Sequence, residues 1–383
     1  NMSEDPEQEY FSDGITEDII TDLSRLPNLF VIARHSTFTY KGKPVKVKQV
    51  AEELGVRYVL EGSFRKAGQR ARITAQLVDA TTGRHVWAER YDREFKDIFA
   101  LQDDITEKVV MAMEVKLTTG EAARIARRQT DNPEAYKLFR RGLDQFRRFN
   151  KVGNAQARRL FEKAVSLDPN FAAVWPMLAM THLVSARFGW SADPARDYAR
   201  AEELVRKALA IDDSNSDAYR VLGQIFLEKR QHEKAIAHGE KSVTLEPNHS
   251  INTLLLGRTL IYVGRPEEAV ELFKRGMRLS PYYSTTFLRF LGNAYRMMGQ
   301  YDEAIEVLER GRAPLPNSPL SFIWLAAAYA EAGKGEEARA AAAEILKRDP
   351  KFSVKRFAKA APYKDPAELK RALNALRKAG LPD

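Results

Sequence analysis

Residues 219–247 read YRVLGQIFLEKRQHEKAIAHGEKSVTLEP, and most of the fold follows from this one stretch. It holds two apolar patterns of helical spacing in a row, with the small residues Gly223 and Ala235 among the large ones and Pro247 at the end. Small residues let two helices approach closely, and proline ends a helix because it lacks an amide hydrogen and its ring clashes with the preceding turn. The stretch therefore predicts two helices packed tightly against each other.

The same residue types return along the chain every 34 or 35 positions. Three series keep this step: Pro247, Pro281, Pro316 and Pro350; Ala235, Ala269, Ala304 and Ala338; Gly223, Gly257, Gly292 and Ala326. A helix pair repeated at this length, with a Leu-Gly pair, a later alanine and a closing proline, matches the tetratricopeptide (TPR) pattern. We therefore predict an all-α TPR solenoid of about six repeats over residues 131–350, with its first two repeats irregular.

Two segments of this half depart from the simple repeat. Residues 188–194, FGWSADP, belong to an insertion in the second repeat, which we expect to form a loop. Trp190 in this loop either packs against its own helices or anchors a partner. Residues 351–383 are expected to supply the capping helix that the open end of a solenoid needs, with a helix over 367–379 followed by Gly380.

Residues 1–100 mix helical and strand patterns and predict an α+β domain. Helices are expected over 15–26 and 47–54, and the apolar run at 29–33 is expected to be a short buried strand. Three further strands are expected at 57–64, 71–80 and 85–91. Because tight turns separate these three strands, they predict an antiparallel meander. A long helix, residues 101–130, is expected to connect this domain to the solenoid.

The charge of the chain favours anionic partners for its second half. The formal net charge is +9, and residues 131–383 hold 41 basic against 31 acidic side chains. A basic surface attracts acidic peptides, nucleic acid or anionic lipid. The simpler interpretation is a well-solvated helical surface, and we do not expect nucleic acid as the partner.

Several kinds of chemistry have no candidate residues. The chain has no Cys, which excludes disulfides, thiolate nucleophiles and Cys-ligated metal sites. It has no phosphate-binding glycine loop and no nucleophile elbow, and its six His residues form no His-Glu-x-x-His motif. We therefore expect no catalytic residue, no metal site and no cofactor. No apolar run reaches roughly 18 residues, so we expect no membrane span in this chain.

The predicted solenoid offers one candidate site. The first helix of each TPR, the A helix, lines the concave groove, and its groove positions hold Arg220, Gln224, Arg258, Arg289, Asn293 and Arg296. Arginine prefers planar bidentate partners such as carboxylates. These residues therefore predict a groove for a protein partner, through an acidic segment or a free C-terminal carboxylate. The alternative is that arginine is simply common in this sequence.

The first domain resembles a known family. The segments EDPEQEYFSDGITEDIITDLSRLPNLFVIARHSTFTYKGK, VAEELGVRYVLEGSFRKAGQRARITAQLVDATTGRHVWAERYDR and DIFALQDDIT are similar to the TolB N-terminal-like domain. That domain precedes TPR repeats in bacterial class III adenylate and guanylate cyclases and in CadC-like winged-helix regulators, and the ending LNALRKAGLPD also resembles those cyclase-associated proteins. The resemblance covers essentially the whole chain. Its motifs are specific for the architecture but indicate no catalytic or ligand-binding residue.

The resemblance implies a regulatory and interaction region rather than an enzyme. Family members carry an apolar strand before the residues matching 1–3, so its lack here implies a fragment of a longer protein. Their cyclase domain has no counterpart, so no catalytic residue is carried over. We expect the C-terminal part of a class III adenylate cyclase; the alternatives are the sensory region of a winged-helix regulator and a stand-alone TPR adaptor. The expected compartment is the cytoplasm, or the periplasm if a membrane span lies upstream; the sequence leaves the oligomeric state open.

Overall fold

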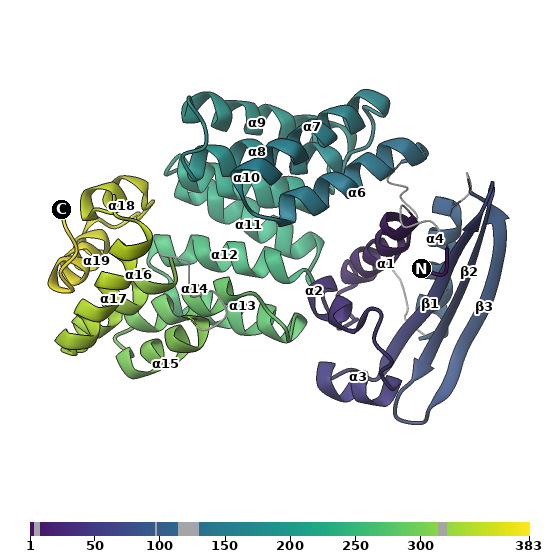
Figure 1. Ribbon diagram of the computed structural model, residues 1–383, viewed down its shortest axis with the longest axis horizontal. Helices are drawn as coiled ribbons and strands as arrows, with labels where there is room; N and C mark the ends of the chain where they lie inside the picture. The colour runs from purple at the N-terminus through teal and green to yellow at the C-terminus, as the bar shows by residue number, and fades with distance from the viewer. Residues whose placement is uncertain (4–7, 96–97, 114–129, 313–319) are drawn as a thin grey trace. The chain divides into compact units, whose positions relative to one another are not determined.

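The computed structural model describes residues 1–3, 8–95, 98–113, 130–312 and 320–383 (Figure 1). The chain divides into two compact units. The first consists of Asn1–Val221, Ser242–His249 and Leu279–Pro281, and the second consists of Leu222–Lys241, Ser250–Arg278 and Tyr282–Asp383.

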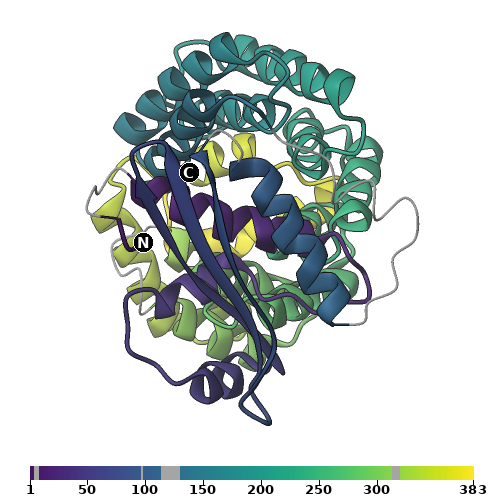
Figure 2. The ribbon, with the colours of Figure 1, turned by 90° about the vertical axis from the view of Figure 1, so that its right-hand side faces the viewer.

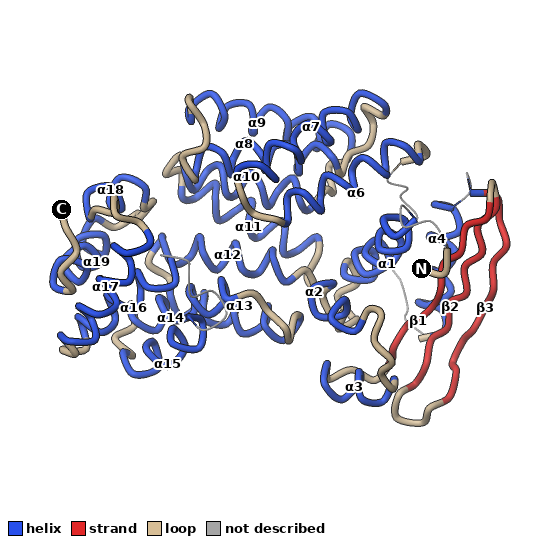
Figure 3. Tube along the Cα trace, viewed as in Figure 1, coloured by secondary structure: helices blue, strands red, loops and turns tan. Residues whose placement is uncertain are grey.

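The first unit contains an antiparallel sheet of three strands. β1 (Tyr58–Ala67), β2 (Arg70–Asp79) and β3 (Arg84–Glu94) follow one another in the order β1-β2-β3. Alternate residues of β2 are buried, with Ala71 at 1% and Ile73 at 5% exposure, while the residues between them face outward. This confirms the predicted meander, and Figure 3 shows that the strands are confined to this region among the described residues.

Helices cover the buried face of the sheet. α1 (Glu9–Ser24) packs against α4 (Ile98–Ala112), and α4 packs against β2 and β3, as the turned view in Figure 2 shows. α3 (Val47–Leu54) ends at Gly55, whose φ of +67° places it in the left-handed region. The predicted helices at 15–26 and 47–54 are therefore present, and α1 begins earlier than predicted. The predicted connecting helix is described only as far as α4, and residues 114–129 lie outside the described part.

The predicted strand at 29–33 is wrong. This segment has no strand partner among the described residues, and Phe30 is 43% exposed. The amide of Ala33 donates instead to the carbonyl of Leu279 at 2.7 Å, and two short helices follow, α2 (Arg34–Thr37) and η2 (Phe38–Tyr40). An apolar run of five residues carries no periodicity, so its backbone hydrogen bonds are decided by a segment far away in the sequence.

The rest of the first unit is made of antiparallel helix pairs. α6 (Pro133–Arg147) pairs with α7 (Lys151–Leu167), and α8 (Val174–Arg187) pairs with α9 (Pro194–Ile211). The side chains of Asn132, Asn150 and Asp193 accept hydrogen bonds from the first turns of the helices that follow them. In the predicted insertion, Trp190 is half-buried and stacks on Phe188 with ring centroids 5.6 Å apart, so it packs against its own loop.

The second unit continues the helix pairs. Three of its helices have residues in the first unit: α10 at its start, and α11 and α13 at their ends. The helices are α10 (Ser216–Glu228), α11 (His232–Leu245), α12 (Ser250–Val263), α13 (Pro266–Leu279), α14 (Thr285–Met297), α15 (Tyr301–Arg312), α16 (Leu320–Glu331) and α17 (Gly335–Arg348). The repeated small residues lie where the pairs meet. A Cβ atom built on Gly257 would lie 2.5 Å from the ring of Phe273, and one on Gly292 would lie 2.4 Å from Leu308. This confirms the predicted TPR-like all-α array.

Two helices complete the C-terminal end. α19 (Pro366–Lys378) covers nearly the same residues as the helix predicted over 367–379, and it packs against α16 and α17. Gly380 follows it with a φ of +94°. The sequence did not predict α18 (Val354–Ala360) or the extended residues 361–365 between the two helices.

Candidate functional site

The predicted groove residues are mostly buried and already have acidic partners. Arg220, in the first unit, is 8% exposed and forms an ion pair with Asp217 at 2.5 Å, one turn earlier in α10. Burial raises the pKa of Asp217, but the charges of Arg220 and His249 and the hydrogen bond from Arg220 bring it below its usual value. The carboxylate of Asp217 therefore compensates the charge of Arg220.

In the second unit, Arg258 on α12 joins two neighbouring A helices. Its guanidinium donates from Nη1 to the side-chain oxygen of Gln224 and from Nη2 to Glu228 Oε1 at 2.7 Å. Arg258 is only 7% exposed. A buried ion pair is costly to break, because the remaining charge loses its partner without regaining water.

Asn293 and Arg296 form a second buried group on α14. Arg296 has no exposed surface, and it donates from Nε to Asn293 Oδ1 at 3.0 Å and from Nη1 to Glu331 Oε2 at 2.7 Å. Arg289, on the same helix, is half-buried, with its guanidinium 4.9 Å from the centre of the Phe290 ring. The structure thus brings Gln224 to Arg258 and Asn293 to Arg296, and whether these residues bind a partner stays a prediction.

Residues 361–365, APYKD, lie against these side chains, and we call them the strap. Tyr363 is 4% exposed and its ring makes an edge contact with Tyr262 of α12, with centroids 5.1 Å apart. The backbone amide of Lys364 donates to the carbonyl of Tyr262 at 2.8 Å. The strap therefore contacts the side of the second unit formed by the A helices α12, α14 and α16 and by the turn after α10, which we call the A-helix face.

Arg371 on α19 fixes the other end of the strap to the A helices. It donates to the carbonyls of Arg296 and Met297, both at 2.9 Å, and to Glu331 Oε1 at 2.8 Å. A cation at the C-terminal end of a helix satisfies carbonyl groups that have no partner within the helix. Glu331 consequently accepts hydrogen bonds from two arginines, one on the A-helix face and one on the capping helix.

The environment of Tyr363 is polar at its tip. Burial raises the pKa of this phenol well above its usual value, and the nearby charge of Arg296 and the amide of Asn293 oppose that change. Two residues predicted as groove ligands therefore face the tip of a tyrosine from the chain itself. The helical periodicity could not reveal this contact, because Tyr363 lies 70 positions after Asn293 and outside the repeat.

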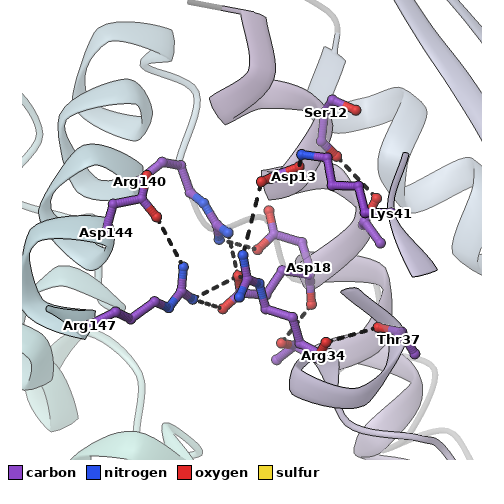
Figure 4. Close-up of polar contacts among 12 residues, drawn as sticks. Ser12, Asp13, Asp18, Arg34, Thr37, Lys41, Arg140, Asp144 and Arg147 are labelled. Atoms are coloured by element: carbon purple, nitrogen blue, oxygen red, sulfur yellow. Dashed lines mark hydrogen bonds and ion pairs between the residues drawn. The ribbon is translucent and has the colours of Figure 1, made fainter. Parts of the chain in front are cut away.

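A second polar cluster lies inside the first unit, between α1 and α6 (Figure 4). Glu17 pairs with Arg34 at 2.7 Å, with Arg140 at 2.5 Å and with Arg147 at 2.8 Å. Burial alone would raise the pKa of Glu17, but the charges of these three arginines lower it to about 2. Beside it, Tyr136 of α6 donates to Asp18 Oδ2 at 2.6 Å. This cluster holds the N-terminal α+β region to the first helix of the array.

The same α+β region has a second attachment at the end of α11. Asn248 donates from Nδ2 to the carbonyls of Leu26 at 2.9 Å and Leu29 at 2.8 Å, and Arg25 pairs with Glu246 at 3.4 Å. Nothing in the sequence pattern indicates either attachment, since each joins residues more than 100 positions apart.

The described residues add two negative findings. In the ranges given above, no three His, Asp or Glu side chains are grouped so that they could hold a metal ion. In the same part of the chain, no helix is long and apolar enough to cross a membrane.

Comparison with known proteins identifies the repeats. A family model described as "Tetratricopeptide repeat" matches residues 260–321 and 295–361, and one described as "Anaphase-promoting complex, cyclosome, subunit 3" matches residues 195–276. The chain therefore contains a TPR region, as its sequence predicts. Among solved structures, the crystal structure of the APC/C hetero-tetramer Cut9-Hcn1 matches with a TM-score of 0.50 and 19% identity, covering 74% of this chain and 52% of that chain. This likeness supports the fold alone.

Curated relatives match part of the chain. A protein of Rhizobium meliloti (strain 1021) named "Putative adenylate cyclase 3" is 47% identical over 222 residues, which are 58% of this chain and 38% of the relative. Anaphase-promoting complex subunit 7 of Arabidopsis thaliana is 23% identical over 184 residues, which are 48% of this chain and 31% of the relative. The chain thus spans less than two fifths of the length of these relatives.

Proposed function

We propose that this chain is the protein-interaction and regulatory region of a signalling protein related to class III adenylate cyclases. The TPR array binds a protein partner, and the N-terminal α+β domain fixes the geometry between the array and an output domain. The chain itself carries no catalytic residue in this proposal, and it works in the cytoplasm.

One observation carries the proposal: the 47% identity to the Rhizobium meliloti relative over 222 residues. The matched part makes up 38% of that relative, which leaves room in it for an output domain besides the matched region. The two attachments within the first unit support a regulatory role, because they hold the α+β region to the array through buried charges and carbonyl contacts.

An acidic peptide as the partner is less well supported than a protein partner in general. Arg220, Arg258 and Arg296 already have carboxylate partners in Asp217, Glu228 and Glu331. An acidic peptide would have to displace these carboxylates, and a buried charge pair is costly to break. The six predicted groove residues remain a proposal as ligands for an acidic segment, with Arg289 as the more accessible member.

The size of the native polypeptide tests the proposal. An antibody to this chain, used on an immunoblot of the source cell, should detect a band well above 43.4 kDa. That polypeptide should synthesise cyclic AMP or cyclic GMP. A large band that binds DNA and makes no cyclic nucleotide would favour a winged-helix regulator instead. A band near 43.4 kDa would contradict the proposal and favour a stand-alone TPR adaptor.

A further inference from the structure

The strap occupies the A-helix face although it is not part of the repeat. Ala361, Pro362 and Tyr363 are all buried, which is uncommon for a connection between two helices. A buried connection needs partners for its backbone groups, and here these partners come from helix pairs far away in the sequence. The second unit therefore binds this segment as it would bind an extended peptide.

The backbone of the strap is held by side chains and by a main-chain group of the face. His232 donates from Nε2 to the carbonyl of Pro362 at 2.8 Å, Arg230 donates to the carbonyl of Tyr363 at 3.5 Å, and Lys364 donates its amide to Tyr262. Recognition of extended segments commonly combines such backbone bonds with pockets for single side chains. The side-chain anchor here is the ring of Tyr363.

The charges of the strap are complementary to the face. Lys364 pairs with Glu233 at the start of α11 at 2.5 Å. Arg371 just beyond the strap pairs with Glu331 at 2.8 Å. Both contacts place a cation of the C-terminal segment against a carboxylate of the array. The face therefore offers a carboxylate, Glu233, to a basic residue directly after the aromatic anchor.

Arg230 gives an independent reason to regard this contact as a binding site. It lies in the turn between α10 and α11 with a φ of +56°, a region in which residues other than glycine are strained. The corresponding turns of the next three helix pairs contain Gly264, Gly299 and Gly333, all with positive φ. Glycine would remove the strain at position 230, but it would also remove the guanidinium that reaches the carbonyls of Lys359 and Tyr363.

The strap does not satisfy the site completely. Among the described residues, Nη2 of Arg296 is buried without a hydrogen-bond partner, and the hydroxyl of Tyr363 and Nδ2 of Asn293 make no hydrogen bond of good geometry although the Asn293 side chain faces that hydroxyl. Buried polar atoms without a partner weaken the state that contains them. A segment that made these hydrogen bonds could therefore replace the strap.

We propose that the strap is an internal ligand of the A-helix face. The partner presents a segment of the same chemistry: extended, with an aromatic hydroxyl that enters the site of Tyr363 and a basic residue directly after it. This inference rests on the proposed role of the array in binding a protein, and it names the chemistry of the partner. The partner segment and the strap exclude each other.

A peptide added to the full chain tests the exclusion. The probe is a fluorescein-labelled peptide of residues 357–367, FAKAAPYKDPA, and its binding is followed by fluorescence anisotropy. We expect the Kd to be at least tenfold lower for the Tyr363→Ala chain than for the wild type, because the emptied site accepts the peptide. The exposed tyrosine Tyr282 provides the matched control, and Tyr282→Ala should bind the peptide as weakly as the wild type does.

A second variant keeps the test decisive if Tyr363→Ala does not melt cooperatively. Lys364→Ala removes the ion pair that the strap makes with Glu233 and leaves the A-helix face unchanged, so it should lower the Kd of the peptide about threefold. Because Lys364 is exposed, this variant should keep the melting temperature of the wild type. Equal affinity for the wild type and a folded strap variant would overturn the proposal, and so would equal binding of a peptide carrying Y363A. Either result would contradict only the proposal that the strap is an internal ligand. The proposed function would be unaffected, because it is tested separately by the size and activity of the native polypeptide.

Discussion

Glu17 receives three guanidinium groups, from Arg34, Arg140 and Arg147, and this arrangement has a consequence for pH. Its pKa is about 2 in the folded protein, against an ordinary value of 4.5. A carboxylate with a lowered pKa stabilises the folded state at every pH above its unfolded value, and this contribution is lost as the pH falls through its folded value. At about 1.4 kcal/mol per unit, the shift corresponds to about 3 kcal/mol.

We predict that Glu17→Gln lowers the free energy of unfolding of the first unit by about 3 kcal/mol at pH 7. The difference between variant and wild type should shrink between pH 4.5 and pH 2, because Glu17 takes up its proton in the unfolded chain over this range while the folded protein still holds it ionised. Urea titrations followed by circular dichroism at several pH values measure this difference in the free energy of unfolding. Glu134→Gln, on the exposed side of α6, is the matched control. A Glu17→Gln effect of the same size at pH 2.5 and pH 7 would contradict this explanation.

The residues of the candidate site show what a single sequence can indicate. Their spacing within the repeat correctly places Arg258, Asn293 and Arg296 on A helices. It does not indicate that Glu228 and Glu331 would pair with them, because those carboxylates belong to neighbouring A helices and the repeat pattern says nothing about charge pairs. The six-residue binding surface remains a prediction, and the contact with Tyr363 lies outside what periodicity can show.

At the scale of the elements, the small residues of the repeat set the distance between the helices of a pair. A Cβ atom on Gly292 would lie 2.4 Å from Leu308, so α14 and α15 would have to move apart. At Gly335, at the start of α17, the nearest atom to such a Cβ is the end of the Arg339 side chain at 3.5 Å. The same chemical change therefore has opposite expected effects at the two positions.

Gly292→Ala should lower the free energy of unfolding by about 1–3 kcal/mol, because the added methyl overpacks the contact between the helices. Gly335→Ala should leave it unchanged or raise it by up to about 1 kcal/mol, because alanine favours the helix. Thermal melts of both variants measure the difference. If the two variants were equally stable, close packing at Gly292 would not be the reason for the small residue.

Helices and strands with a clear hydrophobic period were predicted correctly, whereas segments without a period were not. The helix pairs and the meander have clear periods of 3.6 and 2 residues, and the structure contains them. The apolar run at 29–33 has no period, and its backbone bonds with Leu279, far along the chain. α18 and the strap are short and irregular, so their positions depend on contacts with residues as distant as His232.

At the scale of the whole molecule, the basic excess after residue 130 is an incomplete guide to the partner. It suggests an acidic ligand, yet several of the arginines behind this expectation are neutralised inside the protein by Asp217, Glu228 and Glu331. The C-terminal segment itself brings cations to the A-helix face through Lys364 and Arg371. The net charge of the chain describes its surface as a whole. The specificity for a partner depends on which charged side chains have no partner of opposite charge within the protein.

Hydrogen exchange on the intact chain tests most directly whether the A-helix face is a peptide-binding site held by the strap. The amide of Lys364 donates to the carbonyl of Tyr262, so we predict slow exchange of this amide in the wild type and fast exchange in Arg230→Gly. The amides of α17 should stay protected in both proteins. Exchange of the Lys364 amide in the wild type as fast as that of the C-terminal residue Asp383 would contradict the account.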